Sequence, residues 1–111
     1  MIRVLVAVEP RMYREVLVVA LRQRRPRIEV ILADPAALDR MVERCEPDVV
    51  VCSRTTSLVQ EIAVSWVQVT ANDGLEAEVS VGGRHSAISD LGIEDLLAVV
   101  DETESLLTLR G

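Results

Sequence analysis

The alternation of short apolar runs with longer segments of mixed polarity is the feature that most constrains the fold. Four runs rich in β-branched residues read IRVLVAV (2–8), RIEVILAD (27–34), DVVVC (48–52) and SWVQVTA (65–71). Runs of this length and composition are typical of strands buried in a parallel sheet. Their alternation with helical segments predicts an α/β sheet that is covered on both faces and built by right-handed crossovers.

Helices are expected after the first and third runs, the first of them amphipathic and the second short and weaker. A first helix is expected over residues 11–25, because Pro26 cannot continue it. Its apolar side chains on a common face are Met12, Val16, Val19 and Ala20. A shorter helix is expected over residues 57–64.

The helix between the second and third runs has both a start signal and an apolar stripe. Asp34 suits an N-cap, and Pro35 suits the first helical position. The stripe recurs at i, i+3, i+4 and i+7 and consists of Leu38, Met41, Val42 and Cys45. This spacing predicts a helix that packs on the sheet and ends before Pro47.

The last third of the chain departs from the alternation. ANDG (71–74) is a turn signal, and residues 76–89 alternate in polarity on both sides of Gly82-Gly83. That pattern predicts a β-hairpin, with His85 exposed near its turn. A terminal helix is expected over residues 90–107, where apolar side chains recur at helical spacing: Ile93, Leu96, Leu97 and Val100.

Together these elements predict a single domain over residues 1–111. The expected architecture is a three-layer α/β fold with a flavodoxin-like, mostly parallel sheet and an antiparallel hairpin at one edge.

Charge and composition exclude several classes of function. The formal net charge of −6 disfavours nucleic-acid binding, because that binding depends on neutralising phosphates. No run approaches the roughly 20 apolar residues of a membrane span, and the first run is too short for a signal peptide. Cys45, Cys52 and one distant histidine do not suggest a zinc site. We therefore expect a cytoplasmic chain with reduced thiols, no cofactor and no membrane or nucleic-acid partner.

Five segments carry a resemblance to a known family: IRVLVAVEPRMYREVLVVAL, IEVILAD, ALDRMVERCEPDVVVCS, VQVTA and GIEDLLAVVDE. Together they resemble the receiver domain of two-component response regulators, in the subtype usually fused to a helix-turn-helix output domain. Receivers are doubly wound α/β domains, so the resemblance implies the same fold class as the alternation of strands and helices.

The resemblance also implies a site at the strand ends. Receivers take a phosphoryl group on an aspartate after the third strand, an acidic pair holds magnesium, and a hydroxyl and a lysine contact the phosphoryl group. The matching positions here are Ser53, the pair Val8-Glu9 and Thr70, and the chain has no lysine. An acyl phosphate needs a carboxylate nucleophile, and magnesium needs carboxylate ligands. The resemblance therefore implies a degenerate receiver whose pocket of Glu9, Ser53 and Thr70 does not undergo phosphotransfer.

Two further interpretations of the strand ends remain open. Arg54, Thr55 and Thr56 precede a helix start and are possible contacts for an anion held on helix amides. Glu9 and Asp34 are candidates for a metal site if they fold together, although no metal is expected from the chain as a whole.

Catalysis is the remaining interpretation of this region. Cys52 or Ser53 could act as a nucleophile, but the surrounding residues match neither a phosphatase loop nor a hydrolase elbow. The structural alternative is a buried cysteine followed by a serine at a strand end. We therefore expect a protein that is not an enzyme.

The leading expectation is a regulatory or adaptor module that acts by binding another protein. The alternatives are a small-ligand or anion sensor in the strand-end crevice and a small enzyme with a Cys or Ser nucleophile. A homodimer through the hairpin edge or the terminal helix is also expected, since an open edge strand invites pairing. The arginine cluster could dock an acidic partner, including the acidic stretch 101–104 of a second copy; it consists of Arg22, Arg24, Arg25 and Arg27.

Overall fold

The computed structural model describes residues 1–71 and 74–110 of the chain. Its helices are α1 (Arg11–Arg24), the short 3₁₀ helix η1 (Pro35–Ala37), α2 (Leu38–Cys45), α3 (Ser57–Ile62) and α4 (Ile93–Arg110). Its strands are β1 (Arg3–Ala7), β2 (Glu29–Leu32), β3 (Val49–Cys52), β4 (Ser65–Ala71), β5 (Leu75–Val81) and β6 (Arg84–Ser89). The four predicted runs thus each contain a strand, and the fourth strand has the predicted bounds.

The strands form one mixed sheet in the order β2-β1-β3-β4-β5-β6. The pairs β1–β2, β1–β3 and β3–β4 are parallel, whereas β4–β5 and β5–β6 are antiparallel. The parallel part follows the order 2-1-3-4 expected of a flavodoxin-like sheet. The complete order departs from it, because the fifth position is taken by an antiparallel strand. The predicted hairpin therefore joins the main sheet, and the turn at Gly82-Gly83 is confirmed.

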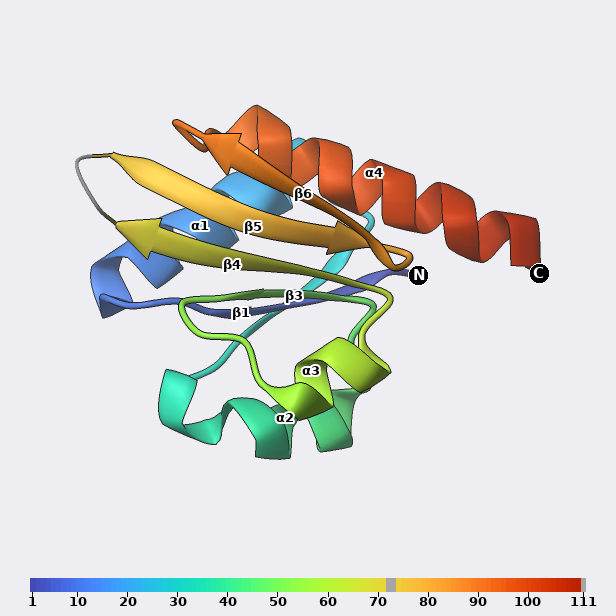
Figure 1. Cartoon of the computed structure of the whole chain (residues 1–111), viewed down its shortest axis with the longest axis horizontal. Helices are drawn as coiled ribbons and strands as arrows, with labels where there is room; N and C mark the ends of the chain where they lie inside the picture. The colour runs from blue at the N-terminus through green and yellow to red at the C-terminus, as the bar shows by residue number, and fades with distance from the viewer. Residues whose placement is uncertain (72–73, 111) are drawn as a thin grey trace.

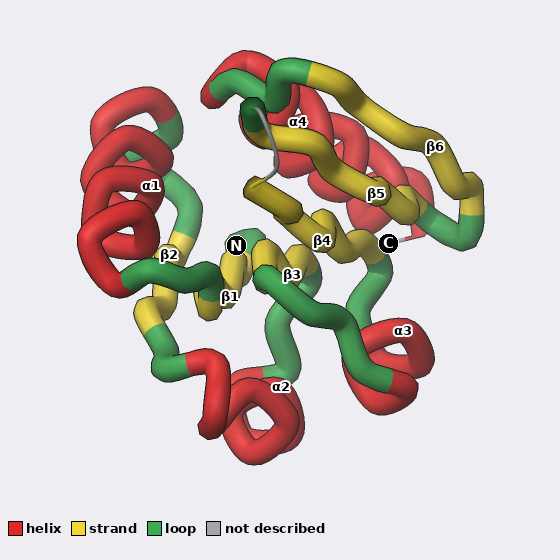
Figure 2. The backbone as a smooth tube through the Cα atoms, turned by 60° about the vertical axis from the view of Figure 1, so that its left-hand side comes forward, coloured by secondary structure: helices red, strands yellow, loops and turns green. Residues whose placement is uncertain are grey.

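Helices cover the sheet from two sides (Figures 1 and 2). On one face α1 and α4 pack over a core of aliphatic side chains that includes Leu17, Leu21, Leu97 and Val67. On the other face α2 and α3 cover a second core around Trp66 from β4. The three predicted layers are confirmed in this form.

The first helix packs on a different face from the one that its sequence suggested. Its buried residues are Arg14, Leu17, Val18 and Leu21. The side chains of Met12, Val16 and Val19 are 73%, 58% and 53% exposed. The predicted common face of α1 is therefore its solvent-facing side, and a second apolar stripe with the same helical spacing is buried.

Local signals placed α2 correctly. Asp34 accepts a hydrogen bond from the Ala36 amide at 2.8 Å, so it caps η1, which leads directly into α2. Leu38 and Val42 are buried, whereas Met41 and Cys45 of the same predicted stripe are half-buried at its margin.

The predicted turn at 71–74 includes residues 72 and 73, which lie outside the described residues.

Polar contacts join α4 to the end of α1 and to β4. Arg24 donates to Glu94 at 2.8 Å and Arg25 to Asp101 at 2.7 Å, joining α1 to α4. Within the core, the hydroxyls of Ser65 and Thr103 lie 2.5 Å apart, and both residues are fully buried.

Among the described residues, no helix is both long and apolar enough to cross a membrane.

The hairpin is covered on one face only. Its α4-facing side chains, including Ala77, Val79 and Val81, belong to the first core. On the opposite face Glu76 and Glu78 are exposed, and in β6 every residue except Ile88 is exposed, whichever face it lies on. Within the described part of the chain, β6 pairs with β5 alone and so forms an open edge of the sheet.

Candidate functional site

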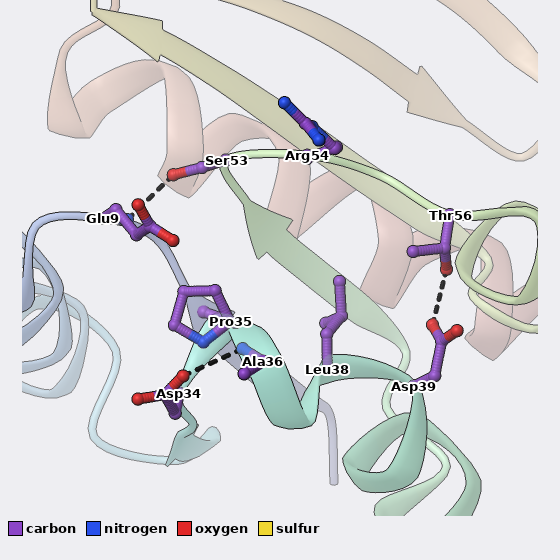
Figure 3. Close-up of a pocket in the computed structure, with 10 residues that line it drawn as sticks. Glu9, Asp34, Pro35, Ala36, Leu38, Asp39, Ser53, Arg54 and Thr56 are labelled. Carbon is purple, nitrogen blue, oxygen red and sulfur yellow. Dashed lines mark hydrogen bonds between the residues drawn. The ribbon is translucent and has the colours of Figure 1, made fainter.

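A crevice of about 620 Å³ opens at the carboxyl ends of β1, β2 and β3. At this position the chain leaves β1 for α1 on one face of the sheet, whereas it leaves β2 for α2 on the other face. Such switch points are the common ligand-binding position in open α/β sheets. Figure 3 shows the side chains that line the crevice, which come from the segments after β1, β2 and β3.

Two of the three pocket residues implied by the receiver resemblance meet in this crevice. The Glu9 amide donates a hydrogen bond to Ser53 Oγ at 2.8 Å (Figure 3). The bond ties the segment after β1 to the segment after β3, since parallel strands bring their carboxyl ends to one edge. The Ser53 hydroxyl thus accepts a backbone hydrogen bond at the position that the resemblance assigns to the phosphoacceptor.

The third residue, Thr70, lies elsewhere. β3 ends at Cys52, which pairs with Gln68, and β4 continues to Ala71 beyond that point. There Thr70 is paired with Glu76 of β5, and it lines a separate depression on the uncovered hairpin face. The residue that instead contacts the loop after β3 is Gln68, whose Oε1 accepts from the Thr55 amide at 2.8 Å. Sequence reasoning missed Gln68, because an amide in a strand carries no distinct signal.

The predicted anion contacts are divided between different roles. Arg54 lines the crevice and is exposed. The Thr56 hydroxyl caps α3 by accepting from the Val59 amide at 3.2 Å and donates to Asp39 Oδ1 at 2.6 Å. The Thr55 hydroxyl is buried without a hydrogen-bond partner among the described residues.

Charge in the crevice is unfavourable for an anion. Three carboxylates, those of Glu9, Asp34 and Asp39, line it together with the single guanidinium of Arg54. Like charges that share a site raise each other's electrostatic cost, so an added anion meets net repulsion. Among residues 1–71 and 74–110, no group of three or more Asp, Glu, His or Cys side chains is arranged to hold a metal ion. Glu9 and Asp34 do line one crevice, as the metal hypothesis required, but without a third ligand.

Cys52, one of the two predicted nucleophiles, lies in surroundings that do not activate its thiol. Cys52 is fully buried, and burial raises the pKa of its thiol to about 12, an effect that the neighbouring Thr55 side chain partly opposes. A thiol with so high a pKa is protonated at neutral pH and is a poor nucleophile. His85 is exposed on β6, where its ring and that of Trp66 lie in a T-shaped arrangement with 5.7 Å between centroids.

The arginine cluster at the end of α1 makes contacts within the chain. Arg22 donates to the Val30 carbonyl at 3.0 Å. Arg25 forms two hydrogen bonds with Asp101, so the acidic residue expected to face a second copy is paired internally.

Comparison with models of known families, with curated proteins and with solved structures found no match to this chain.

Proposed function

We propose that this chain is a receiver-like regulatory module that acts through protein–protein contact and takes no phosphoryl group. The observation that carries the proposal is the exposed face of α1. Met12, Val16 and Val19 are each more than half exposed and lie on one helix face, which we call the α1 stripe. Large apolar side chains gathered on one exposed helix face are typical of an interaction surface.

The strand-end crevice supports the second part of the proposal. The phosphoacceptor position is a serine whose oxygen accepts the Glu9 amide, and the chain has no lysine to contact a phosphoryl group. The parallel strand order 2-1-3-4 agrees with a receiver-like ancestry, on which the assignment of these positions rests. The buried Cys52 with its raised pKa supports a protein that is not an enzyme.

Site-specific photocrosslinking tests the contact. A photoreactive amino acid is placed at Val16 in the cells that make the protein, with Gln60, exposed on α3, as the control position. The expected result is a discrete protein adduct at position 16 and none at position 60. The absence of any adduct at position 16, or equal adducts at both positions, overturns the proposal.

Acetyl phosphate with Mg²⁺ tests the chemistry. The intact mass is expected to stay unchanged, and the amide NMR signals of Glu9 and Ser53 are expected to stay in place. A mass increase of one phosphoryl group would show that the chain is a phosphoacceptor after all.

A small-ligand sensor is the second candidate, and the volume of the crevice favours it. Its lining of three carboxylates and one guanidinium selects a cationic or neutral polar ligand rather than an anion. Spermidine, Mg²⁺ and inorganic phosphate serve as probes in an NMR titration. Saturable shifts at Glu9, Ser53 and Arg54 with spermidine or Mg²⁺ alone would favour the sensor.

A further inference from the structure

We infer that the partner of the α1 stripe is the α1 stripe of a second copy, with the two helices antiparallel; this rests on the proposed function. The residues that carry the inference have a regular spacing. Met12, Val16, Val19 and Gln23 follow one another at intervals of four, three and four residues along the exposed side of α1. Alternation of this kind is the seam pattern of paired helices, in which side chains of one helix fill gaps in the other.

These four residues, which we call the seam, lie opposite the side of α1 that packs on the core. Arg14, Leu17, Val18 and Leu21 face the core, and the main contacts of α1 within the described residues are with β1, β2 and α4. A helix at the surface of a monomer buries only one side, so a second apolar stripe on the opposite side stays exposed unless another chain covers it. The shallow depression along the seam is lined by the seam residues together with Glu15 and Ala20.

The flanks of the seam select the antiparallel arrangement. Glu15 and Arg22, seven residues apart, lie on one flank, and Tyr13 and Ala20 lie on the other. A two-fold axis that makes two facing helices antiparallel brings identical flanks together, so Glu15 of each copy meets Arg22 of the other. A parallel pair would instead bring the flank of Glu15 against the flank of Ala20 and form no ion pair. The antiparallel register forms two symmetric ion pairs at once.

Both groups are available for this contact. Glu15 is 53% exposed and accepts only from Arg11, at 3.2 Å, within the described residues. Arg22 uses one N–H on the Val30 carbonyl, and a guanidinium has five. With the two-fold axis midway between Glu15 and Arg22, Val16 and Val19 of the two copies interleave along the seam. A single-helix interface is small, so we expect a weak dimer that forms as concentration rises.

Sedimentation velocity from low micromolar to millimolar concentration tests the pairing. The wild-type chain is expected to shift from monomer to dimer over this range. Val16→Glu is expected to abolish the shift, because it places a charge in the centre of the seam. Leu109→Glu is the matched control: Leu109 is an exposed apolar residue on α4, 84% exposed, and its replacement is expected to leave the dimer unchanged. Circular dichroism of each variant checks that the fold is retained.

Charge reversal tests the register. Glu15→Arg is expected to raise the Kd roughly tenfold by replacing two attractions with two repulsions. Adding Arg22→Glu in the same chain is expected to restore the wild-type Kd. A wild-type chain that stays monomeric, or a dimer that survives Val16→Glu, overturns the inference. Failure of the double variant to restore binding overturns the antiparallel register.

The outcomes separate this inference from the proposed function. A monomeric chain whose position 16 crosslinks to a different protein in cells contradicts self-pairing and leaves the proposed function standing. A purified dimer without any crosslink at position 16 in cells contradicts the proposed function and leaves self-pairing as a property of the isolated chain.

Discussion

Cys52 provides the sharpest test of whether this chain is an enzyme. Its thiol is fully buried at the end of β3, and burial raises its pKa from 9.0 to about 12. Because the thiolate is the reactive form, about one molecule in ten thousand would carry it near pH 8, roughly a thousandfold fewer than at the ordinary pKa. We therefore expect alkylation of Cys52 in the folded protein to be at least about a thousandfold slower than in the unfolded chain.

Iodoacetamide labelling followed by peptide mass spectrometry measures both rates. The folded and urea-unfolded proteins are treated side by side, and Cys45, which is half-buried, reports on reagent access in the same sample. A folded-state rate for Cys52 within about tenfold of the unfolded rate would refute the argument from burial. Such a result would also return the cysteine nucleophile to consideration.

The same pKa has a consequence for stability. A group whose folded pKa is raised contributes stability that is fully present below its unfolded pKa and is lost as pH rises through the folded value. For Cys52 the window is pH 9.0 to about 12. Across it, the free energy of unfolding of the wild type should fall relative to that of Cys52→Ala, by up to about 1.4 kcal/mol per pH unit. Parallel urea titrations near pH 8 and above pH 10 measure the difference, and an unchanged gap between the two proteins would contradict the expected shift.

Substitutions at three other places test features that stabilise or strain the fold. Thr103→Val should cost about 1–3 kcal/mol in urea denaturation. Thr103 Oγ1 already donates to the Val99 carbonyl, so Ser65 is the donor between the two hydroxyls and would lose its acceptor; a further Ser65→Ala should recover most of the loss. Glu46→Gly should stabilise the chain by about 0.5–1 kcal/mol in thermal unfolding, since Glu46 ends α2 at φ 47°, where a side chain is strained. The hydrogen bond from Arg25 lowers the pKa of Asp101, so its stabilising effect is present above the unfolded pKa and is lost as pH falls through the folded value; Asp101→Asn should therefore be more destabilising at neutral pH than in acid.

The elements were predictable because their signals are local. A run of β-branched residues between turn residues is enough to place β4, and Asp34-Pro35 is enough to start the helical segment before α2. The orientation of α1 was not predictable, because Met12, Val16 and Val19 repeat with the same period as Leu17, Val18 and Leu21. Only the position of the sheet decides between two apolar faces. The buried arginine Arg14 makes the correct face look the more polar one.

The contact between Glu9 and Ser53 was predictable because it depends on strand ends. Glu9 and Ser53 meet because β1 and β3 are parallel neighbours. Thr70 was expected in the crevice, but it lies outside it. How far a strand continues beyond the end of one neighbour depends on the strand that pairs with its other edge. Here β5 keeps β4 extended beyond the end of β3, and Gln68 takes the place beside the loop. No property of Gln68 in the sequence distinguishes it from any other polar strand residue.

The order of the sheet has a consequence for how the chain is made. After β1 and β2 have paired, β3 joins the free edge of β1, and then β4, β5 and β6 each join the edge of the strand before them; no described strand enters between two that are already paired. Synthesis from the N-terminus can therefore build the sheet outward, with the parallel strands first and the hairpin last. The parallel pairings, which need long crossovers, can form before β6 is synthesised, and the antiparallel hairpin adds the open edge after them.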